Sequence, residues 1–158
     1  VFLSNFRAYM QSEELLAGIS AQQLTFHEAL TLASIIERET RADEEKATIA
    51  SVFYNRLADG MHLQTDPTIQ YALGFDEIEQ TWWKTQLTEA DMQVDSPYNT
   101  YLYAGLPPGP IANPSLASLE AVAYPAQTPY FYFRAKCDGS GTHAFSVTYE
   151  EHLNNACP

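Results

Sequence analysis

The stretch Leu30–Pro67 constrains the fold most, because two helical patterns meet there at a polar corner. Apolar residues recur at helical spacing as far as Ile36 and run directly into the motif ERET at residues 37–40. A second helical pattern follows over about Asp43–Leu57. A carboxylate at the end of a buried helix is held rigidly, and partial desolvation there raises its pKa. The stretch therefore predicts an acid at the floor of a cleft.

Length and composition bound the class of protein. With 158 residues and 46% hydrophobic content, we expect one domain over residues 1–158. No run approaches the roughly 18 apolar residues that a membrane span needs. Because the first residue is Val and no signal pattern precedes the first helical stretch, we expect either a mature piece or an expressed fragment. The net charge of −12 argues against nucleic acid and anionic membrane surfaces as partners.

The remaining patterns predict a mostly helical α+β fold with one small antiparallel hairpin. Helices are expected over Val1–Gly18, from a capping box at Thr25–Glu28, over Thr68–Leu73, after an N-cap at Asn113, and from a capping box at Thr148–Glu151; strands are expected over Tyr130–Arg134 and Thr142–Val147.

Two residue pairs leave alternatives open. Cys137 and Cys157 lack the spacing of a metal site; they either form one disulfide that ties the C-terminal tail to the hairpin or remain two thiols. Trp82 and Trp83 either close a core under a loop, which we favour, or stack on a sugar ring.

The sequence lacks the motifs of several common chemistries. There is no Gly-rich phosphate loop, no HExxH and no GxSxG, which disfavours phosphoryl transfer, zinc hydrolysis and triad acyl transfer. What remains is an acid at a helix end, clusters of Gln, Asp, Asn and Thr in turns, and many Tyr. That composition is typical of a carbohydrate site.

Four ordered runs carry a resemblance to a known family: ASIIERET, VFYNRLADGMHLQTDPTIQYALG, SPYNTYLYAGLPPGPIANPSLASLEAVAYPAQTPYFYF and GTHAFSVTYEEH. They closely resemble the catalytic domain of the bacterial endolytic murein transglycosylases, the MltG/YceG-like family, from about Leu24 to Asn154. The resemblance implies a lysozyme-like domain that cuts peptidoglycan glycan strands internally, between N-acetylmuramic acid and N-acetylglucosamine, without metal or cofactor. The product carries a 1,6-anhydro-muramic end.

The resemblance also implies a place in the cell. Family members are tethered to the bacterial inner membrane with the catalytic domain on its periplasmic face. We therefore expect a membrane anchor and an accessory domain in a segment upstream of this chain, and peptidoglycan synthases as possible partners.

The choice of catalytic acid rests on the resemblance, which assigns the role to Glu39. On a helical wheel Glu37 and Glu39 both flank the apolar stripe, so periodicity does not separate them. The alternative for Glu37 is a carboxylate that hydrogen-bonds to nearby loop backbone. One acid is enough for a lytic transglycosylase because the C6 hydroxyl of the substrate attacks the anomeric carbon.

The other predicted cleft residues match the family motifs, but matching does not show contact with sugar. They are Asn55, Gln64, Asp66, Tyr98, Asn99 and Thr100. Asp66 caps a turn in the alternative interpretation, and Asn55 bridges a helix to a loop. We expect a structural role for His143.

Two rival functions stay open at this point. One is a hydrolytic muramidase that uses Glu39 as acid and Asp66 as second carboxylate. The other is a non-catalytic peptidoglycan-binding or scaffold domain of the wall-synthesis machinery.

Overall fold

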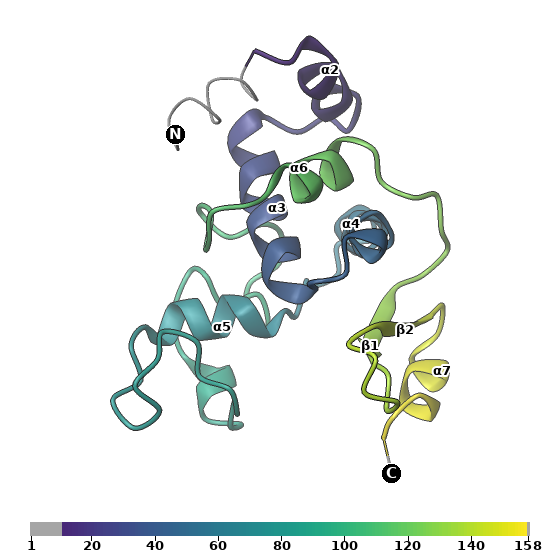
Figure 1. The fold of residues 1–158 in the computed structure, drawn as a ribbon. Coiled ribbons are helices and arrows are strands. Elements are labelled where there is room, and N and C mark those ends of the chain that lie inside the picture. The colour runs from purple at the N-terminus through teal and green to yellow at the C-terminus, as the bar shows by residue number, and fades with distance from the viewer. Residues whose placement is uncertain (1–10, 158) are drawn as a thin grey trace.

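The computed structural model describes residues 11–157, and their fold is mixed α+β and mostly helical, as predicted (Figure 1). The elements are α2 (Glu13–Ala21), α3 (Phe26–Glu39), α4 (Asp43–Ala58), α5 (Asp66–Leu73), the 3-10 helix η1 (Asp91–Gln93), α6 (Leu116–Ala123), β1 (Tyr132–Ala135), β2 (His143–Ser146) and α7 (Tyr149–Asn154). No helix within residues 11–157 is long and apolar enough to cross a membrane.

The hydrophobic core is built on α3, which packs against α4 and α6 (Figure 1). Leu32, Ile35 and Ile36 of α3 are fully buried, as are Phe53 of α4 and Val122 of α6. Burying a large apolar side chain stabilises a fold by about 1.5–3 kcal/mol. The C-terminal end of α3 is therefore fixed by packing. That residues 1–158 form a single domain remains a prediction. It is supported by the hydrophobic cluster that the buried residues of these helices form together.

Local signals set both ends of α3. The predicted capping box at Thr25 and Glu28 is formed, with Thr25 Oγ1 accepting from the backbone N–H of Glu28. The helix ends at Glu39, and Thr40 takes an extended backbone conformation. The chain then turns directly into α4, whose predicted start at Asp43 is confirmed.

The predicted hairpin is formed by β1 and β2, which pair antiparallel with Tyr132 opposite Ser146 and Ala135 opposite His143. Phe133 packs edge-on against Phe53 of the core, with ring centroids 5.8 Å apart. The hairpin is thereby attached to α4, beside the end of α3.

Three predicted helix starts are corrected. Helix α2 begins at Glu13, with Ser12 as its N-cap. The prediction of one continuous helix over Val1–Gly18 is therefore wrong at Ser12. The first ten residues of that predicted helix lie outside the described part of the chain. Helix α5 begins at Asp66, ahead of the predicted Thr68, because Pro67 fits the first turn of a helix.

The third correction concerns α6, which is capped by Ser115 and not by Asn113. Ser115 Oγ accepts from the backbone N–H of Ser118 at 3.3 Å.

The prediction that the two tryptophans close a core under a loop is wrong for Trp82. This residue is 64% exposed and makes a T-shaped contact with Phe75.

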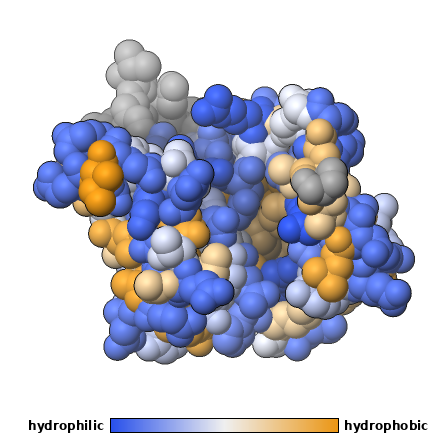
Figure 2. Space-filling view, turned by 90° about the horizontal axis from the view of Figure 1, so that it is seen from below, coloured by the Kyte–Doolittle hydropathy of each residue, from blue (hydrophilic) through white to orange (hydrophobic). Residues whose placement is uncertain are grey.

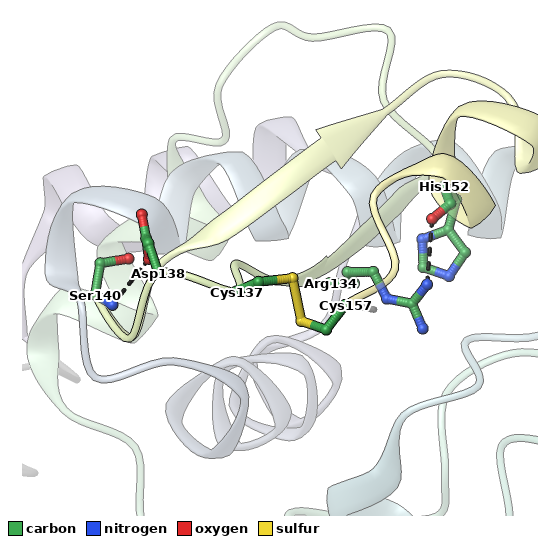
Figure 3. Close-up of a disulfide and its surroundings, with 6 residues drawn as sticks. All are labelled: Arg134, Cys137, Asp138, Ser140, His152 and Cys157. Atoms are coloured by element: carbon green, nitrogen blue, oxygen red, sulfur yellow. Dashed lines mark hydrogen bonds between the residues drawn. A yellow bond between two sulfur atoms is a disulfide. The ribbon is translucent and has the colours of Figure 1, made fainter.

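Cys137 and Cys157 form a disulfide, which settles the alternative that the sequence left open (Figure 3). It joins the residues after β1 to the residues after α7. Helix α7 has no fully buried residue, so it is not anchored by deep packing in the core. Arg134 Nη1 donates to the carbonyl of His152 at 3.3 Å, and Asn155 Nδ2 donates to Ser146 Oγ at 2.9 Å. The disulfide is therefore a main tie between α7 and the hairpin.

We predict that the double substitution Cys137→Ser with Cys157→Ser lowers the free energy of unfolding by about 3 kcal/mol, because a cross-link over this chain separation restricts the unfolded state. Denaturant unfolding of both proteins, with and without reductant, measures this. Reductant should destabilise only the wild type. Equal stability of the two proteins under oxidising conditions would contradict the prediction.

Candidate active site

Glu39, the last residue of α3, lies in a depression of about 550 Å³ that we call the main cleft. Its walls come from the ends of α3 and α4, the start of α5, the hairpin and α7. Figure 2 shows this face of the molecule hollowed between the part built by α5 and the part built by the hairpin and α7. A second depression of about 480 Å³, the side groove, runs from Glu39 between residues 38–42 and the turn at Ser140 and Gly141.

A larger depression of about 680 Å³ lies elsewhere, between α2, α4 and α6. None of the site residues predicted from the sequence lines it. The main cleft and the side groove are therefore where the chemistry is expected.

The carboxyl group of Glu39 has no hydrogen-bond or ion-pair partner among residues 11–157. The pKa of Glu39 is raised from 4.5 to about 8: burial is the largest cause, the negative charge of Asp66 acts in the same direction, and the positive charge of Arg56 opposes both. At neutral pH Glu39 is therefore mostly protonated. A protonated carboxylic acid facing a cleft is a proton donor.

The positive charge of Arg56 is the smallest of the three influences on the pKa of Glu39, and its guanidinium is bound to backbone. Its Nε donates to the carbonyl of Phe131 and its Nη1 to the carbonyl of Leu63, each at 2.7 Å. No carboxylate in the described part of the chain lies within ion-pair distance of it. Arg38, next to Glu39 in sequence, lies over the ring of Trp83 at 3.8 Å.

Glu37 has the opposite environment. Its Oε2 accepts from Ser118 Oγ at 2.5 Å, from Ser115 Oγ at 2.6 Å and from Lys46 Nζ at 3.3 Å. Burial alone would raise its pKa, but these hydrogen bonds and one from the backbone N–H of Ser115 lower the pKa to about 2. Glu37 is therefore ionised and joins α3 to the start of α6.

Gln64 and Asp66 both line the main cleft. Tyr101 Oη donates to Asp66 Oδ1 at 2.6 Å, which fixes the carboxylate at the start of α5. Gln64 has a φ of +51°, in the left-handed region that non-glycine residues rarely adopt. Its backbone N–H donates to the carbonyl of Thr100 at 3.1 Å, and this contact holds the strained residue in place.

Asn55 and Tyr98 do not line the main cleft or the side groove, and Asn55 has instead the bridging role that the alternative interpretation gave it. Asn55 Nδ2 donates to the carbonyls of Thr128 and Tyr130 at 2.9 and 2.8 Å, so its amide bridges α4 to the segment before β1. The ring of Tyr98 packs against that of Tyr71, with centroids 4.7 Å apart.

Asn99 and Thr100 are also misplaced by the prediction, because both are buried beneath the cleft wall. Asn99 Nδ2 donates to the carbonyls of Met92 and Val94. The hydroxyl of Thr100 accepts from the backbone N–H of Thr65 at 3.1 Å. These two residues hold the loops that carry Gln64 and Tyr101.

Sequence reasoning missed several residues of the main cleft. Tyr101 follows the predicted Thr100 directly in the sequence. The prediction therefore identified the correct loop, but it chose a buried residue of that loop in place of the residue that lines the cleft. Tyr132, Tyr149 and His152 form an aromatic wall, with ring centroids 5.8 Å apart for Tyr132 and Tyr149 and 5.5 Å apart for Tyr132 and His152. Aromatic residues at these positions were the only signal, and it does not specify a cleft.

His143 combines its predicted structural role with a place in the site. Its Nδ1 is 2.7 Å from Glu45 Oε2, and the residue also lines both the main cleft and the side groove. Within residues 11–157 no group of three or more His, Cys, Asp or Glu side chains is arranged to hold a metal ion.

Comparison with known proteins gives consistent matches. The model of the YceG-like family matches residues 2–157. The endolytic murein transglycosylase of Bacillus subtilis (strain 168) is 45% identical over 130 residues, which cover 82% of this chain and 34% of that protein. The protein of the same name from Streptococcus pneumoniae serotype 2 (strain D39 / NCTC 7466) is 36% identical over 137 residues, covering 87% of this chain and 24% of the relative.

A solved structure is also similar. The crystal structure of a YceG-like protein from Listeria monocytogenes has 43% sequence identity and a TM-score of 0.78, covering 96% of this chain and 45% of that one. This chain thus spans about a third and a quarter of the length of the two curated relatives.

We predict that Glu39 makes the protein less stable as pH rises from 5 to 8. The folded state keeps the Glu39 proton up to about pH 8, whereas the unfolded chain releases it near 4.5, so the unfolded state binds fewer protons in this range. Relative to Glu39→Gln, the wild type should lose up to about 1.4 kcal/mol per pH unit. Denaturant unfolding at several pH values measures the difference, and a constant difference would contradict the prediction.

Glu37→Gln is the matched control, because the effect of Glu37 on the pH dependence of stability has the opposite sign to that of Glu39. Because the folded-state pKa of Glu37 is about 2, its contribution to stability is present above pH 4.5 and is lost as pH falls towards 2. The difference between wild type and Glu37→Gln should therefore change below pH 4.5 and stay constant between pH 5 and 8.

Proposed function

This chain belongs to the YceG-like family, and from that premise we propose that it is the catalytic part of a peptidoglycan lytic transglycosylase. The proposed reaction cuts glycan strands internally, between N-acetylmuramic acid and N-acetylglucosamine, and leaves a 1,6-anhydro end. One observation carries the proposal: Glu39 is a desolvated carboxylic acid without a protein partner in the described part of the chain, and it faces a cleft. The names of the two curated relatives support the substrate.

In the proposed mechanism, Glu39 acts first as an acid and then as a base. It donates its proton to the glycosidic oxygen as the bond to the anomeric carbon breaks. The C6 hydroxyl of the same muramic acid attacks the anomeric carbon, and the Glu39 carboxylate takes up the hydroxyl proton. The acid is thereby regenerated, and no water enters the product.

Asp66 supports this mechanism through its charge. Its negative charge raises the pKa of Glu39, so that the acid stays protonated until the substrate takes the proton. The hydrogen bond from Tyr101 keeps the Asp66 carboxylate in a fixed position.

A hydrolytic muramidase is the second candidate, because Asp66 lies in the same cleft as Glu39. In that reaction Asp66 would activate water or attack the sugar. The two reactions differ in the mass of the product, since the anhydro end lacks one water.

We further propose that the whole protein is held at the bacterial inner membrane by a segment outside this chain, with the cleft on the periplasmic side. Peptidoglycan synthases are the proposed partners, because an internal cut changes the strands that they extend. The resemblance to the family supports this placement.

We predict that Glu39→Gln lowers kcat for glycan strands by at least about 100-fold, the contribution typical of a general acid. Release of fragments from purified uncross-linked strands, followed by mass analysis of the ends, measures rate and reaction type together. Glu120→Gln is the matched control, because Glu120 is an exposed glutamate on α6, outside the main cleft. Undiminished cleavage by Glu39→Gln would rule out the mechanism, and fragments with hydrolysed ends would identify the muramidase.

We predict that cleavage by the wild type declines above about pH 8, where Glu39 loses its proton. Asp66→Asn should move this decline to lower pH, because removing the neighbouring negative charge lowers the pKa of Glu39. At pH 5 the variant should retain most of its kcat if the C6 hydroxyl is the nucleophile. A loss of 100-fold or more at pH 5 would instead favour Asp66 as the second carboxylate of a hydrolase.

A further inference from the structure

Glu39 and His143 are the two residues that line both the main cleft and the side groove. They therefore stand where the two depressions meet. A glycan strand that occupied both depressions would pass this junction, and the bond protonated by Glu39 would lie there. His143 would then lie beside the same part of the strand.

The ring of His143 is held by Glu45, which lies in the first turn of α4. Glu45 Oε1 accepts from the backbone N–H of His143 at 2.8 Å, and Glu45 Oε2 is 2.7 Å from Nδ1. Both side chains are nearly buried, with 11% and 12% of their surface exposed for His143 and Glu45. The rings of Phe133 and His143 also make a T-shaped contact, with centroids 5.4 Å apart.

This arrangement fixes which nitrogen carries the hydrogen. A carboxylate only accepts hydrogen bonds, so Nδ1 of His143 must be the donor to Glu45. The other nitrogen, Nε2, has no hydrogen-bond partner among residues 11–157 and is not sealed from solvent. In neutral imidazole Nε2 is then a free acceptor, and it belongs to a residue that lines the junction of the two depressions.

We propose that Nε2 of His143 accepts a hydrogen bond from a hydroxyl of the sugar beside the bond that Glu39 protonates, and that Glu45 positions the ring for this contact. The inference rests on the proposed function, which places a glycan strand in the cleft. His143 transfers no proton in this role. It orients the sugar relative to Glu39, and Glu45 acts through His143 without touching the substrate.

Glu45→Gln tests the positioning role because it keeps both hydrogen bonds to His143 but exchanges donor and acceptor in the one to Nδ1. The backbone N–H of His143 can only donate, so the amide oxygen of the glutamine must face it. The amide nitrogen then donates to Nδ1, and the hydrogen of the imidazole moves to Nε2. Nε2 becomes a donor and can no longer accept from a hydroxyl.

We expect Glu45→Gln and His143→Ala each to lower kcat/KM for glycan strands about tenfold, the value of one hydrogen bond to substrate. Glu44→Gln is the matched control: it removes the same charge from the same turn at an exposed residue, and it should leave kcat/KM unchanged. A purely structural His143 predicts that Glu45→Gln is as active as the control, and that result would overturn the proposal.

Nitrogen NMR of the imidazoles tests the contact directly and does not depend on turnover. In the Glu39→Gln variant, which should hold the strand without cutting it, adding uncross-linked glycan oligosaccharides should shift the Nε2 resonance of His143. The resonances of His27, whose Nε2 lies 2.9 Å from the carbonyl oxygen of Pro108, serve as the internal control.

The outcomes separate the two proposals. If the wild type cleaves glycan but the Nε2 resonance does not shift with ligand, the His143 inference is wrong and the proposed function stands. If the wild type releases no fragments, the proposed function fails, and a ligand-induced shift would still support His143 as a glycan-binding residue.

Discussion

The structure depends on one energetic conflict: a carboxylic acid is kept in a desolvated position without a protein partner in the described part of the chain. Burial favours the neutral form of Glu39, and the charge of Asp66 strengthens the effect. Such a position is unfavourable unless the surrounding structure fixes it. The fully buried apolar face of α3, with Leu32 and Ile36, supplies that support. The core therefore serves the proposed chemistry by holding the end of α3 still.

The contrast between Glu37 and Glu39 shows how neighbours decide the role of identical side chains. They stand two residues apart on one helix, yet the pKa values lie near 2 and 8. Hydroxyl groups of Ser115 and Ser118 stabilise the ionised form of Glu37, whereas Glu39 receives no hydrogen bond from residues 11–157. One carboxylate secures the packing of α6 against α3, and the other remains free to exchange a proton.

The cleft is assembled from segments that are far apart in the chain. Helices α3 and α5 form one side, and the hairpin with α7 forms the other (Figures 1 and 2). Arg56 connects these parts by donating to the carbonyls of Leu63 and Phe131. The Cys137–Cys157 disulfide ties the helix that carries Tyr149 to the hairpin. The shape of the cleft thus depends on a few long-range contacts, and this explains why a small number of substitutions can test it.

The sequence by itself determined the local structure: capping boxes, helical spacing and the hairpin pattern act between near neighbours, so α3, α4, the hairpin and α7 follow from them. Its resemblance to a family pointed to Glu39. Only the tertiary structure gave Glu37 and Glu39 opposite environments, turned Asn99 inward and Tyr101 toward Asp66, and brought His143 to the junction with Glu39. The physical reason is that irregular loops have no period that sets side-chain direction, and a pKa depends on groups that come together only when the chain folds.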